Sequence, residues 1–499
     1  MIKKLKYGVF TSSAILFVLI IISKFIGFFR DISLSFVYGT SIISDAYLIS
    51  ISIPTVIFTG LISSMMTAYM PIVNNIKDKK EVSKFNNNLL SIIVVFSFIM
   101  SIIFFLGSGV LIKIFGSGLN NEAFKLASSF LKVTIWCLPF LSSGFLFVAI
   151  LQQSENYIQV GMNGIILNIF ILLGIFISKY NLIFLTIMVL IGYIVQSAYF
   201  YFITRRNKLL SFHFIIRLKD RNIIKMFKLM IPVFLGQIIG EINNIVDKNL
   251  ASRLAIGTIT SLDYSYKIIA MIQGIAIFPI ATVVFTKISK IIKNNRTSAY
   301  NIINTTINIG SMIIIPINVF LFFYSREIIK LFFYRGAFDI EALLRTTDCL
   351  EMYSLGLTPF ALRCIIEKIF FADSDSKTPM ITSVIGIFFN IILNIIFMRY
   401  YGHSGIALAT SCSFWINFIL LFIITKKRYK IFNRLDKKIY LVILYFVFDI
   451  FTIVIIKNFI FIKNLFFYIT ISLLLFISIH FVLFLLVYIK KSKKGEVHD

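Results

Sequence analysis

The stretch from Ser23 to Pro71 reads SKFIGFFRDISLSFVYGTSIISDAYLISISIPTVIFTGLISSMMTAYMP, and it carries four charged residues into a long apolar run: Lys24, Arg30, Asp31 and Asp45. A charge at the centre of a bilayer costs at least about 2.5–3.5 kcal/mol, so an apolar span carries one only where a wet environment receives it. For Lys24 and Asp45 two interpretations stay open, a helix-end charge that reaches the headgroups or a cavity residue. Arg30 has apolar flanks (IGFFRDISLSF), which favours a water-filled cavity.

The whole chain has the composition of a membrane protein. Its mean hydropathy is +0.92, and 59% of its 499 residues are hydrophobic. Apolar runs of about 20 residues recur from end to end, and each is long enough to span roughly 30 Å of hydrocarbon. The N-terminus, MIKKLKYGVF, resembles a signal peptide, but no small-residue cleavage site follows it. We therefore expect it to be part of a retained first helix.

The net charge of +27 indicates topology rather than nucleic-acid binding. Lys and Arg lie in the gaps between apolar runs, and rich gaps alternate with poor ones, which is the positive-inside pattern. If the N-terminus is cytoplasmic, the rich gaps 205–228, 287–296 and 426–438 share its side, as does the C-terminal KKSKKGEVHD. We predict that both termini lie in the cytoplasm and that nucleic acid is not a partner.

These runs predict an all-α polytopic membrane protein of about fourteen transmembrane helices. We expect a six-helix lobe at 1–204, a basic cytoplasmic linker at 205–228, a second six-helix lobe at 229–428, and two extra helices with a basic tail at 429–499. The linker could be an amphipathic helix lying on the inner leaflet. The expected spans are 9–37, 44–75, 86–115, 121–153, 157–178, 181–204, 222–253, 260–287, 297–324, 339–372, 378–399, 404–425, 438–457 and 464–489.

The chain offers no sign of enzyme chemistry. Its four Cys residues lie in or beside apolar segments, and its four His residues are scattered, without metal-ligand spacing. It has no P-loop, nucleophile elbow or dinucleotide fingerprint. We expect no catalytic residue, no metal site and no cofactor.

Polar landmarks repeat along the chain at an offset of about 218–222 residues. Arg30 lies nine positions before Gly39, and Lys248 lies nine before Gly257. Chance similarity between apolar segments does not easily keep one offset through several landmarks. Two pseudo-symmetric six-span halves follow, as in transporters whose substrate lies between two parallel repeats, so Arg30 and Lys248 should face a central space. Further pairs at this offset are Asp45 with Asp263, Lys113 with Lys330, Pro139 with Pro359, Ser154 with Ser374, and Asn168 with Asn390.

The segments SKFIGFFRD, YGTSIISDAYLISISIP and AYMPIV resemble the opening of the MurJ/MviN lipid II flippases of the MOP exporter superfamily. In that family the first helix reads S-[RK]-x-x-G-x-x-R-[DE], followed by a Gly and by Asp-Ala-aromatic. Further segments match in order, among them LFFYRGAFD, FFADSDSKTPM and YGHSGIALATSCSFWIN. The resemblance covers the first twelve expected spans, and the last two match only in number and apolarity.

The resemblance implies a V-shaped bundle of two lobes around a cationic cavity, with the last two helices forming a groove for a polyprenyl tail. The family's substrate is lipid II, the lipid-linked precursor of peptidoglycan, which moves from the inner to the outer leaflet of the bacterial cytoplasmic membrane. Carried over by position, Lys24 and Arg30 fall on first-helix cations, Asp45 on a second-helix acid and Lys267 on an eighth-helix cation. With Lys248 from the repeat, these five residues form our expected substrate-binding set.

Some positions depart from the family pattern. Other members often have Arg where Phe58 stands and Glu-Gly where Ile62 and Ser63 stand. Some have Asp and Glu in place of Tyr266 and Ala270. The expected cavity therefore stays cationic but loses part of its acid and Arg complement, which leaves room for a related lipid-linked glycan as substrate.

An anionic lipid-linked substrate also suits these residues physically. A diphosphate carries about two charges, and cations in a low-dielectric cavity bind it through charge-assisted hydrogen bonds. Arg presents a fork that matches phosphate, whereas Lys acts as a point charge. The prenyl chain could stay in the bilayer while the head group crosses by alternating access, without any chemistry on the substrate.

Three other functions and several energy sources stay open. The chain could flip another undecaprenyl-diphosphate-linked oligosaccharide, of the capsule or O-antigen type, or serve as a non-transporting scaffold for cell-wall synthesis proteins. A multidrug antiporter of the same superfamily would need an acidic cavity, against which the cations argue. Transport could be coupled to the membrane potential, Na⁺ or H⁺. Asp247, Asn390 and Asn394 are candidate oxygen ligands for a coupling cation, although packing would also explain them.

Overall fold

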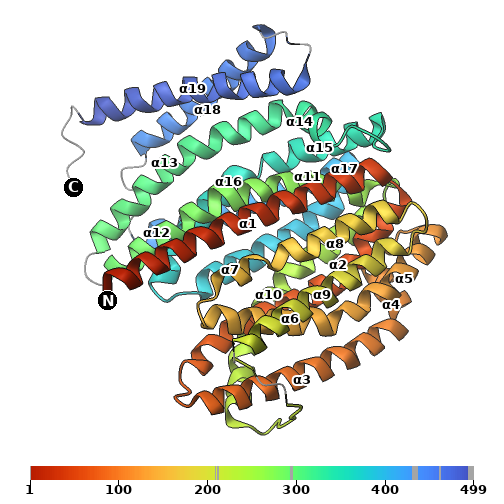
Figure 1. Cartoon of the computed structure of the whole chain (residues 1–499). Helices are drawn as coiled ribbons and strands as arrows, with labels where there is room; N and C mark the ends of the chain where they lie inside the picture. The colour runs from red at the N-terminus through yellow and green to blue at the C-terminus, as the bar shows by residue number, and fades with distance from the viewer. Residues whose placement is uncertain are drawn as a thin grey trace. The chain divides into compact units, whose positions relative to one another are not determined.

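The structure, a computed structural model, describes residues 2–207, 209–210, 213–292, 296–429, 436–459, 462 and 464–492. All regular elements in these ranges are helices (Figure 1). Among the described residues, nine helices or continuous helix groups are long and apolar enough to cross a membrane. One of them, α17 (Lys377–Tyr429), covers two expected spans, which the non-helical Gly402 separates.

The chain divides into two compact units, and unit 1 comprises Met1–Thr260 with Arg335–Phe338. In it, α10 packs on α2, although the sequence places α10 at the start of the second predicted lobe. The division into lobes therefore stays a prediction about the chain's repeat rather than a description of these units. The helices of unit 1 are α1 (Ile2–Tyr38), α2 (Ile42–Val73), α3 (Lys79–Leu106), α4 (Ser108–Phe115), α5 (Asn121–Thr134), α6 (Leu138–Gln153), α7 (Tyr157–Gly161), α8 (Asn163–Ile177), α9 (Phe184–Arg206) and α10 (Arg221–Ala251).

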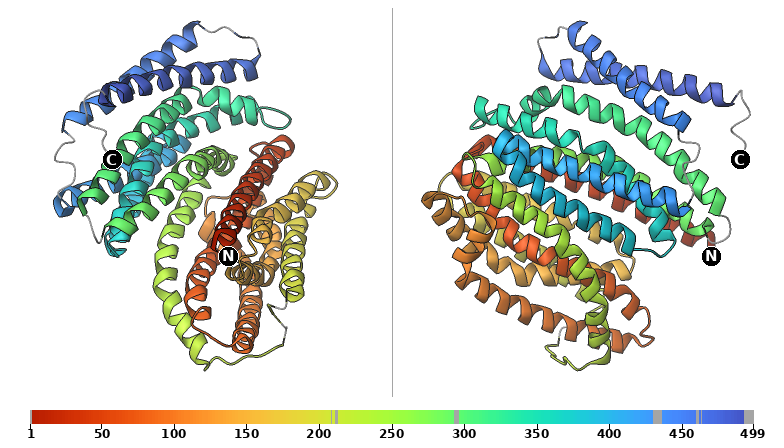
Figure 2. Two further views of the ribbon diagram at one scale, coloured as in Figure 1. Left: turned by 60° about the vertical axis from the view of Figure 1, so that its left-hand side comes forward. Right: turned by 180° about the vertical axis from the view of Figure 1, so that it is seen from behind.

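Unit 2 comprises Ser261–Tyr334 and Asp339–Asp499. Its last two helices pack on α13 and cross each other at the edge of the unit (Figure 2). Asp449 of α18, which is buried, and His480 of α19 form a hydrogen bond that joins this pair. The helices of unit 2 are α11 (Thr258–Ile272, whose first three residues, 258–260, belong to unit 1), α12 (Phe278–Ile291), α13 (Arg296–Phe323), α14 (Ser325–Phe332), α15 (Ile340–Ser354), α16 (Leu357–Ala372), α17, α18 (Asp436–Phe459) and α19 (Leu465–Ser492).

Serine hydroxyls join the helices in the interior of unit 1. Ser142 of α6 donates to Oγ of Ser97 on α3 at 3.1 Å, and the hydroxyls of Ser143 on α6 and Ser197 on α9 lie 2.9 Å apart. All four side chains are buried. Lipid tails are as apolar as leucine, so burial alone gives helices little reason to associate in a membrane. Small residues that allow close packing and hydroxyls that bridge helices supply the missing attraction.

Local structure repeats between the two halves of the chain. Helices α4 and α14 each have eight residues and begin at Ser108 and Ser325. The turn after α6 has its positive φ at Glu155 (60°), and the turn after α16 has it at Ser374 (62°). The same backbone bond closes both turns, from Asn156 to Leu151 at 2.9 Å and from Asp375 to Phe370 at 2.8 Å. The predicted internal repeat is therefore visible in the backbone.

The basic linker between α9 and α10 has no regular secondary structure at 213–217, where an amphipathic helix was one possibility. The side chain of Asn88 on α3 bonds to both backbone polar groups of Arg217. Its Oδ1 accepts from the N–H of Arg217 at 2.7 Å, and its Nδ2 donates to the carbonyl of Arg217 at 3.0 Å. Ser91 accepts in the same way from the N–H of Ile215. These side-chain bonds satisfy the backbone without a helix, and α10 begins at Arg221.

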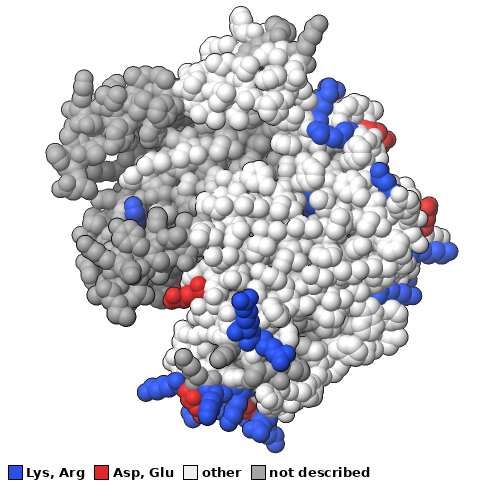
Figure 3. Space-filling model, in the orientation of Figure 1, with Lys and Arg blue, Asp and Glu red and all other residues white. Residues whose placement is uncertain are grey.

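The charged residues leave a broad apolar surface. On the face shown in Figure 3, Lys and Arg gather mostly at the bottom and right-hand edges, and the surface between them is almost uncharged. Helix α3 exposes Phe98, Ile102 and Leu106 to the outside of unit 1. Large exposed apolar side chains would be costly in water, whereas the hydrocarbon of a bilayer accepts them.

A glycine before α11 provides a test of the backbone geometry. Gly257 has a φ of +86°, and a Cβ at this position would overlap the backbone oxygen of Thr40. Gly257→Ala should lower the thermal unfolding midpoint, since a left-handed backbone costs an ordinary residue about 1–2 kcal/mol before any overlap. Gly236→Ala is the matched control, because a Cβ there meets nothing within 4 Å. It should leave the midpoint unchanged or raise it, and equal loss in both variants would contradict this account.

Candidate functional site

Arg30 of α1 is held by two side chains in unit 1. Its Nε and Nη2 donate to Oδ1 of Asp31 at 3.0 and 2.8 Å, and its Nη1 donates to Oδ1 of Asn168 on α8 at 2.8 Å. The side chain of Arg30 remains 24% exposed, whereas that of Asp31 is 7% exposed. Neighbours on a helix are about 100° apart, but the long Arg30 side chain folds back across this angle to reach Asp31.

Close packing of α1 on α7 and α8 fixes the position of Asn168. A Cβ at Gly164 would overlap Oγ of Ser23, and a Cβ at Gly161 would lie 2.6 Å from Cβ of Leu19. Gly27 in turn faces the amide of Asn168. Small residues therefore let the two helices approach until the amide of Asn168 reaches the guanidinium, as in other close helix pairs in membranes.

Lys24 lies on the same helix as Arg30 but is exposed, and so are its neighbours Phe25 and Phe29. Within the described part of the chain no carboxylate lies within ion-pair distance of Lys24. The structure therefore presents Lys24 and Phe25 one to two turns before Arg30 on α1, with Phe29 directly before it. Both interpretations of Lys24, as a cavity residue or as a headgroup contact, stay open.

Asp45 has a structural role in unit 1. Its Oδ2 accepts from the N–H of Gly257 at 2.6 Å, and its Oδ1 accepts from the N–H and the hydroxyl of Thr260 at 2.9 and 2.6 Å. The carboxylate thus binds the N-terminus of α11, where free N–H groups and the helix dipole favour a negative charge. The residue is only 5% exposed. Its predicted contact with substrate stays a prediction, and the capping role is what the structure describes.

The remaining predicted cations lie in different units. Lys267 of α11, in unit 2, forms an ion pair with Asp263 one turn earlier at 2.6 Å. Lys248 lies in the last turn of α10, in unit 1, beside Asp247, which accepts from Nδ2 of Asn243 at 3.3 Å. The structure brings Arg30 together with Asp31 and Asn168. Lys267 and Lys248 lie on different helices, and each has an acidic residue of the same helix nearby.

The candidate ion ligands Asn390 and Asn394 form a buried amide pair in unit 2. Nδ2 of Asn394 donates to Oδ1 of Asn390 at 2.7 Å, and Nδ2 of Asn390 donates to the hydroxyl of Thr410 at 3.3 Å. Both Asn residues are buried. In the described residues no group of three or more His, Cys, Asp and Glu side chains could hold a metal ion.

Two of the positions that depart from the family pattern are part of the packed core. Phe58 and Ile62 of α2 are 2% and 4% exposed. Tyr266 on α11 instead packs edge to face against Tyr353, with ring centroids 5.5 Å apart. A charge could not occupy the α2 positions without a new partner, so in this chain these residues contribute packing.

Sequence reasoning missed one ion pair and one histidine–carboxylate contact in apolar helices. Arg363 and Glu367 of α16 are paired at 2.7 Å, and their spacing of four residues in one apolar run is a readable signal for a helix-surface pair. The pair between Asp449 and His480 joins α18 to α19 and has no such local signal. The sequence analysis also missed Asn168 as a partner of Arg30, although it named Asn168 as a landmark of the repeat.

The fold, the repeat and the charged helices define the class of this protein: a multi-pass helical membrane transporter built from two similar halves. A solved structure described as an inward-facing multidrug resistance MATE family transporter of the MOP superfamily matches with a TM-score of 0.68. At 14% identity, with 81% of this chain and 94% of that chain covered, this likeness shows the fold alone.

A family model described as lipid II flippase MurJ matches residues 34–478, so the chain belongs to the MurJ family of transporters. The probable lipid II flippase MurJ of Buchnera aphidicola subsp. Schizaphis graminum (strain Sg) is 30% identical over 418 residues, which cover 81% of each chain. The lipid II flippase MurJ of Thermosipho africanus (strain TCF52B) is 29% identical over 397 residues, 78% of this chain and 80% of that one. A solved structure described as lipid II flippase MurJ in the inward closed conformation matches with a TM-score of 0.83 at 26% identity, covering 95% of this chain and 99% of that chain.

The capping role of Asp45 predicts a loss of stability on substitution. Asp45→Ala should lower the free energy of unfolding by at least about 1.5–3 kcal/mol, the cost of losing one hydrogen bond to a charged group, because three donors lose their acceptor. Asp45→Asn should fall between Asp45→Ala and the wild type. The measurement is the thermal unfolding midpoint of the purified protein in detergent.

Asp348→Ala is the control, because the side chain of Asp348 is 52% exposed and its partner is His403. This change should have an effect within about 0.5 kcal/mol, as is usual for exposed positions. A midpoint for Asp45→Ala equal to that of the control would show that Asp45 does not stabilise the fold.

Proposed function

We propose that this chain moves lipid II from the inner to the outer leaflet of the bacterial cytoplasmic membrane by alternating access. The observation that carries the proposal is the match of the lipid II flippase family model to residues 34–478. Arg30 is the residue through which we expect the structure to serve this function. It lies within an apolar helix, is partly exposed and is held in place by Asp31 and Asn168.

The contacts of Arg30 suit the reversible binding of a phosphate. Asp31 accepts from Nε and Nη2, whereas Nη1 donates to a neutral amide. A phosphate oxygen could replace that amide without breaking the ion pair, so the guanidinium would stay fixed while its partner changes. Charge-assisted bonds to phosphate are about twice as strong as neutral ones, which favours this exchange. Lys24, Lys248 and Lys267 would add positive potential, and Asp45 would hold α2 to the start of α11.

The transported lipid could instead be another undecaprenyl-diphosphate-linked oligosaccharide. The observation that favours this alternative is the packing of Phe58 and Ile62 into the core, at positions where other members often carry charges. A translocation assay with the purified protein, comparing lipid II with other prenyl-diphosphate glycans, separates the two. The membrane potential, Na⁺ or H⁺ would supply the driving force. Of the candidate ion ligands, Asn390 and Asn394 already bond to each other, which favours packing as their role.

The proposed direction of transport depends on topology, and cysteine labelling tests it. In a background without the four native Cys residues, Lys219→Cys should react with a membrane-impermeant reagent only after permeabilisation. Glu122→Cys should react in intact cells. Both side chains are exposed. Lys219 lies just before α10 and Glu122 lies in the first turn of α5, and the two are predicted to be on opposite sides of the membrane. Labelling of position 219 in intact cells, with none at position 122, would reverse the orientation.

Arg30 is the proposed principal substrate cation, and growth rescue after depletion of a host lipid II flippase tests it. Arg30→Ala should abolish rescue at normal membrane level, since no other group occupies its place between Asp31 and Asn168. Arg30→Lys should rescue in part, because the charge survives while the fork does not. Lys267→Ala should reduce rescue less than Arg30→Ala.

Lys125→Ala, which removes an exposed cation of α5, is the control and should rescue fully. Full rescue by Arg30→Ala at normal protein level would remove Arg30 from the mechanism. That result would favour a non-transporting scaffold for cell-wall synthesis proteins.

A further inference from the structure

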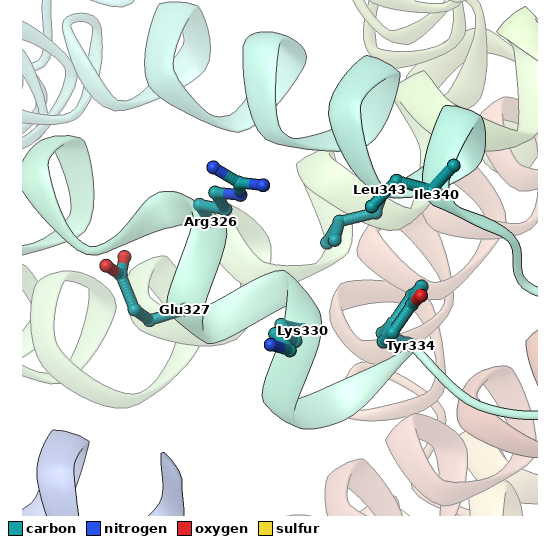
Figure 4. A pocket seen from close by; sticks show the side chains of 6 residues that line it. All are labelled: Arg326, Glu327, Lys330, Tyr334, Ile340 and Leu343. Atoms are coloured by element: carbon teal, nitrogen blue, oxygen red, sulfur yellow. The ribbon is translucent and has the colours of Figure 1, made fainter. Parts of the chain in front are cut away.

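A cavity of about 270 Å³ opens between α14 and α15 in unit 2, away in sequence from the cations assigned to transport. Figure 4 shows Arg326 extending from the first turn of α14 into this space, where Tyr334, Ile340 and Leu343 also point. Lys330 lies one turn further along α14, and Glu327 completes the lining. We call this cavity the α14 pocket.

The charge balance of the α14 pocket is positive. Arg326 and Lys330 are exposed, and neither forms an ion pair with a carboxylate in the described part of the chain. The carboxylate in the lining, that of Glu327, is paired with Lys457 of α18 at 3.2 Å. The two cations and one carboxylate of the lining leave a formal charge of +1 around the cavity, and Lys457 compensates the carboxylate. Such a site attracts an anion, and an Arg beside a Lys is a common pairing for phosphate.

The fold itself does not require two of these charges, those of Arg326 and Glu327. Helix α4 has the same length and the same first residue as α14 and is its counterpart in the repeat. At the places of Arg326 and Glu327 it has Gly109 and Val110. The eight-residue helix therefore forms without an Arg and a Glu at these positions. Lys330 has a counterpart in Lys113 of α4, so Arg326 and Glu327 are the added charges that call for a role outside the helix.

The α14 pocket also has an apolar side and lies at the end of a span. Ile340 is 52% exposed and stands beside the buried Leu343 on α15. Helix α14 follows directly on the apolar span Ile302–Phe323 of α13, and it also contacts α19. On the proposed topology this end of α13 lies on the side of the membrane opposite both termini. A ligand that suits the pocket combines phosphate with hydrocarbon and arrives from the outer leaflet.

We propose that the α14 pocket binds the diphosphate of a prenyl-linked lipid on the outer side of the membrane. This inference rests on the proposed function and assigns a docking site to its product. Arg326 and Lys330, one helical turn apart, each bind one phosphate, and the first prenyl carbons pack on Ile340. Lys457 neutralises Glu327 and connects the pocket to α18. The lipid is thereby held after crossing and before release.

Farnesyl diphosphate is a short probe for this site. Binding to the purified full chain in detergent is measured in an Arg30→Ala background, which removes the proposed transport cation and leaves the α14 pocket intact. Adding both Arg326→Ala and Lys330→Ala should raise the Kd for farnesyl diphosphate at least tenfold. Arg399→Ala, which removes an exposed cation of α17 outside the pocket, should change it less than twofold. The thermal unfolding midpoint of each variant checks that it is folded.

Each outcome decides the assignment. The proposal is supported if the double variant binds farnesyl diphosphate at least tenfold more weakly and the control variant does not. Inorganic diphosphate and phosphatidylglycerol micelles should also compete poorly. Equal binding of inorganic diphosphate would make the ligand a free anion, and strong competition by phosphatidylglycerol would make it any anionic lipid. An unchanged Kd in the double variant would also overturn the proposal. Growth rescue is scored separately: if the wild-type chain fails to rescue, the proposed function falls, while the binding result still decides the pocket.

Discussion

A charged group in hydrocarbon is stable only with a partner, and this constraint organises the interior of both units. The chain meets it in two ways. Arg30 pairs with Asp31, and Lys267 pairs with Asp263, so that each cation keeps an acid beside it. Asp45 instead binds the start of a helix through backbone N–H groups. A paired cation can exchange one contact for a ligand, whereas a capping carboxylate is committed to the fold.

The same scarcity of hydrophobic attraction in a membrane explains how the helices are held together. Buried hydroxyls bridge α3, α6 and α9, and amides bridge the two halves of α17 and the pair α1 and α8. Each bridge needs helices close enough for a short side chain to reach, which small residues allow. Polar residues in these spans are therefore as much a part of the packing as the apolar ones.

The sequence predicts the helices well because the bilayer imposes one length on every span. Most expected spans coincide with a helix, a continuous helix group or one half of α17, whereas 339–372 is divided by a turn into α15 and α16. Partners are harder to predict, since the choice depends on the reach of a side chain in three dimensions. Asp31 stands on another face of α1 than Arg30, yet the guanidinium reaches it. Asn168 is 138 residues from Arg30, and only the repeat drew attention to it.

The linker and Asp45 also show that contacts with neighbouring helices are hard to predict from the sequence. The basic, partly apolar composition of 205–228 suits an amphipathic helix, but Asn88 and Ser91 on α3 bind the backbone of 215–217, which has no regular secondary structure. The composition of a segment indicates which face it can bury. It does not indicate whether a neighbouring helix will supply hydrogen bonds to its backbone. Likewise Asp45 has the position of a cavity acid, while its surroundings make it the cap of α11. Such assignments need the partner as well as the residue.

The glycine contacts between α1 and α8 have a mechanical consequence. Where Gly164 faces Ser23 and Gly27 faces Asn168, the two backbones fit so closely that neither helix can rotate or slide along the other without collision. The hydrogen bond between Arg30 and Asn168 holds the same register in the middle of this contact, and the hydroxyls of Tyr38 and Ser178 meet at its end. The two helices should therefore behave as a single rigid body. Any movement that carries the Arg30 charge across the membrane interior would have to take α8 with it.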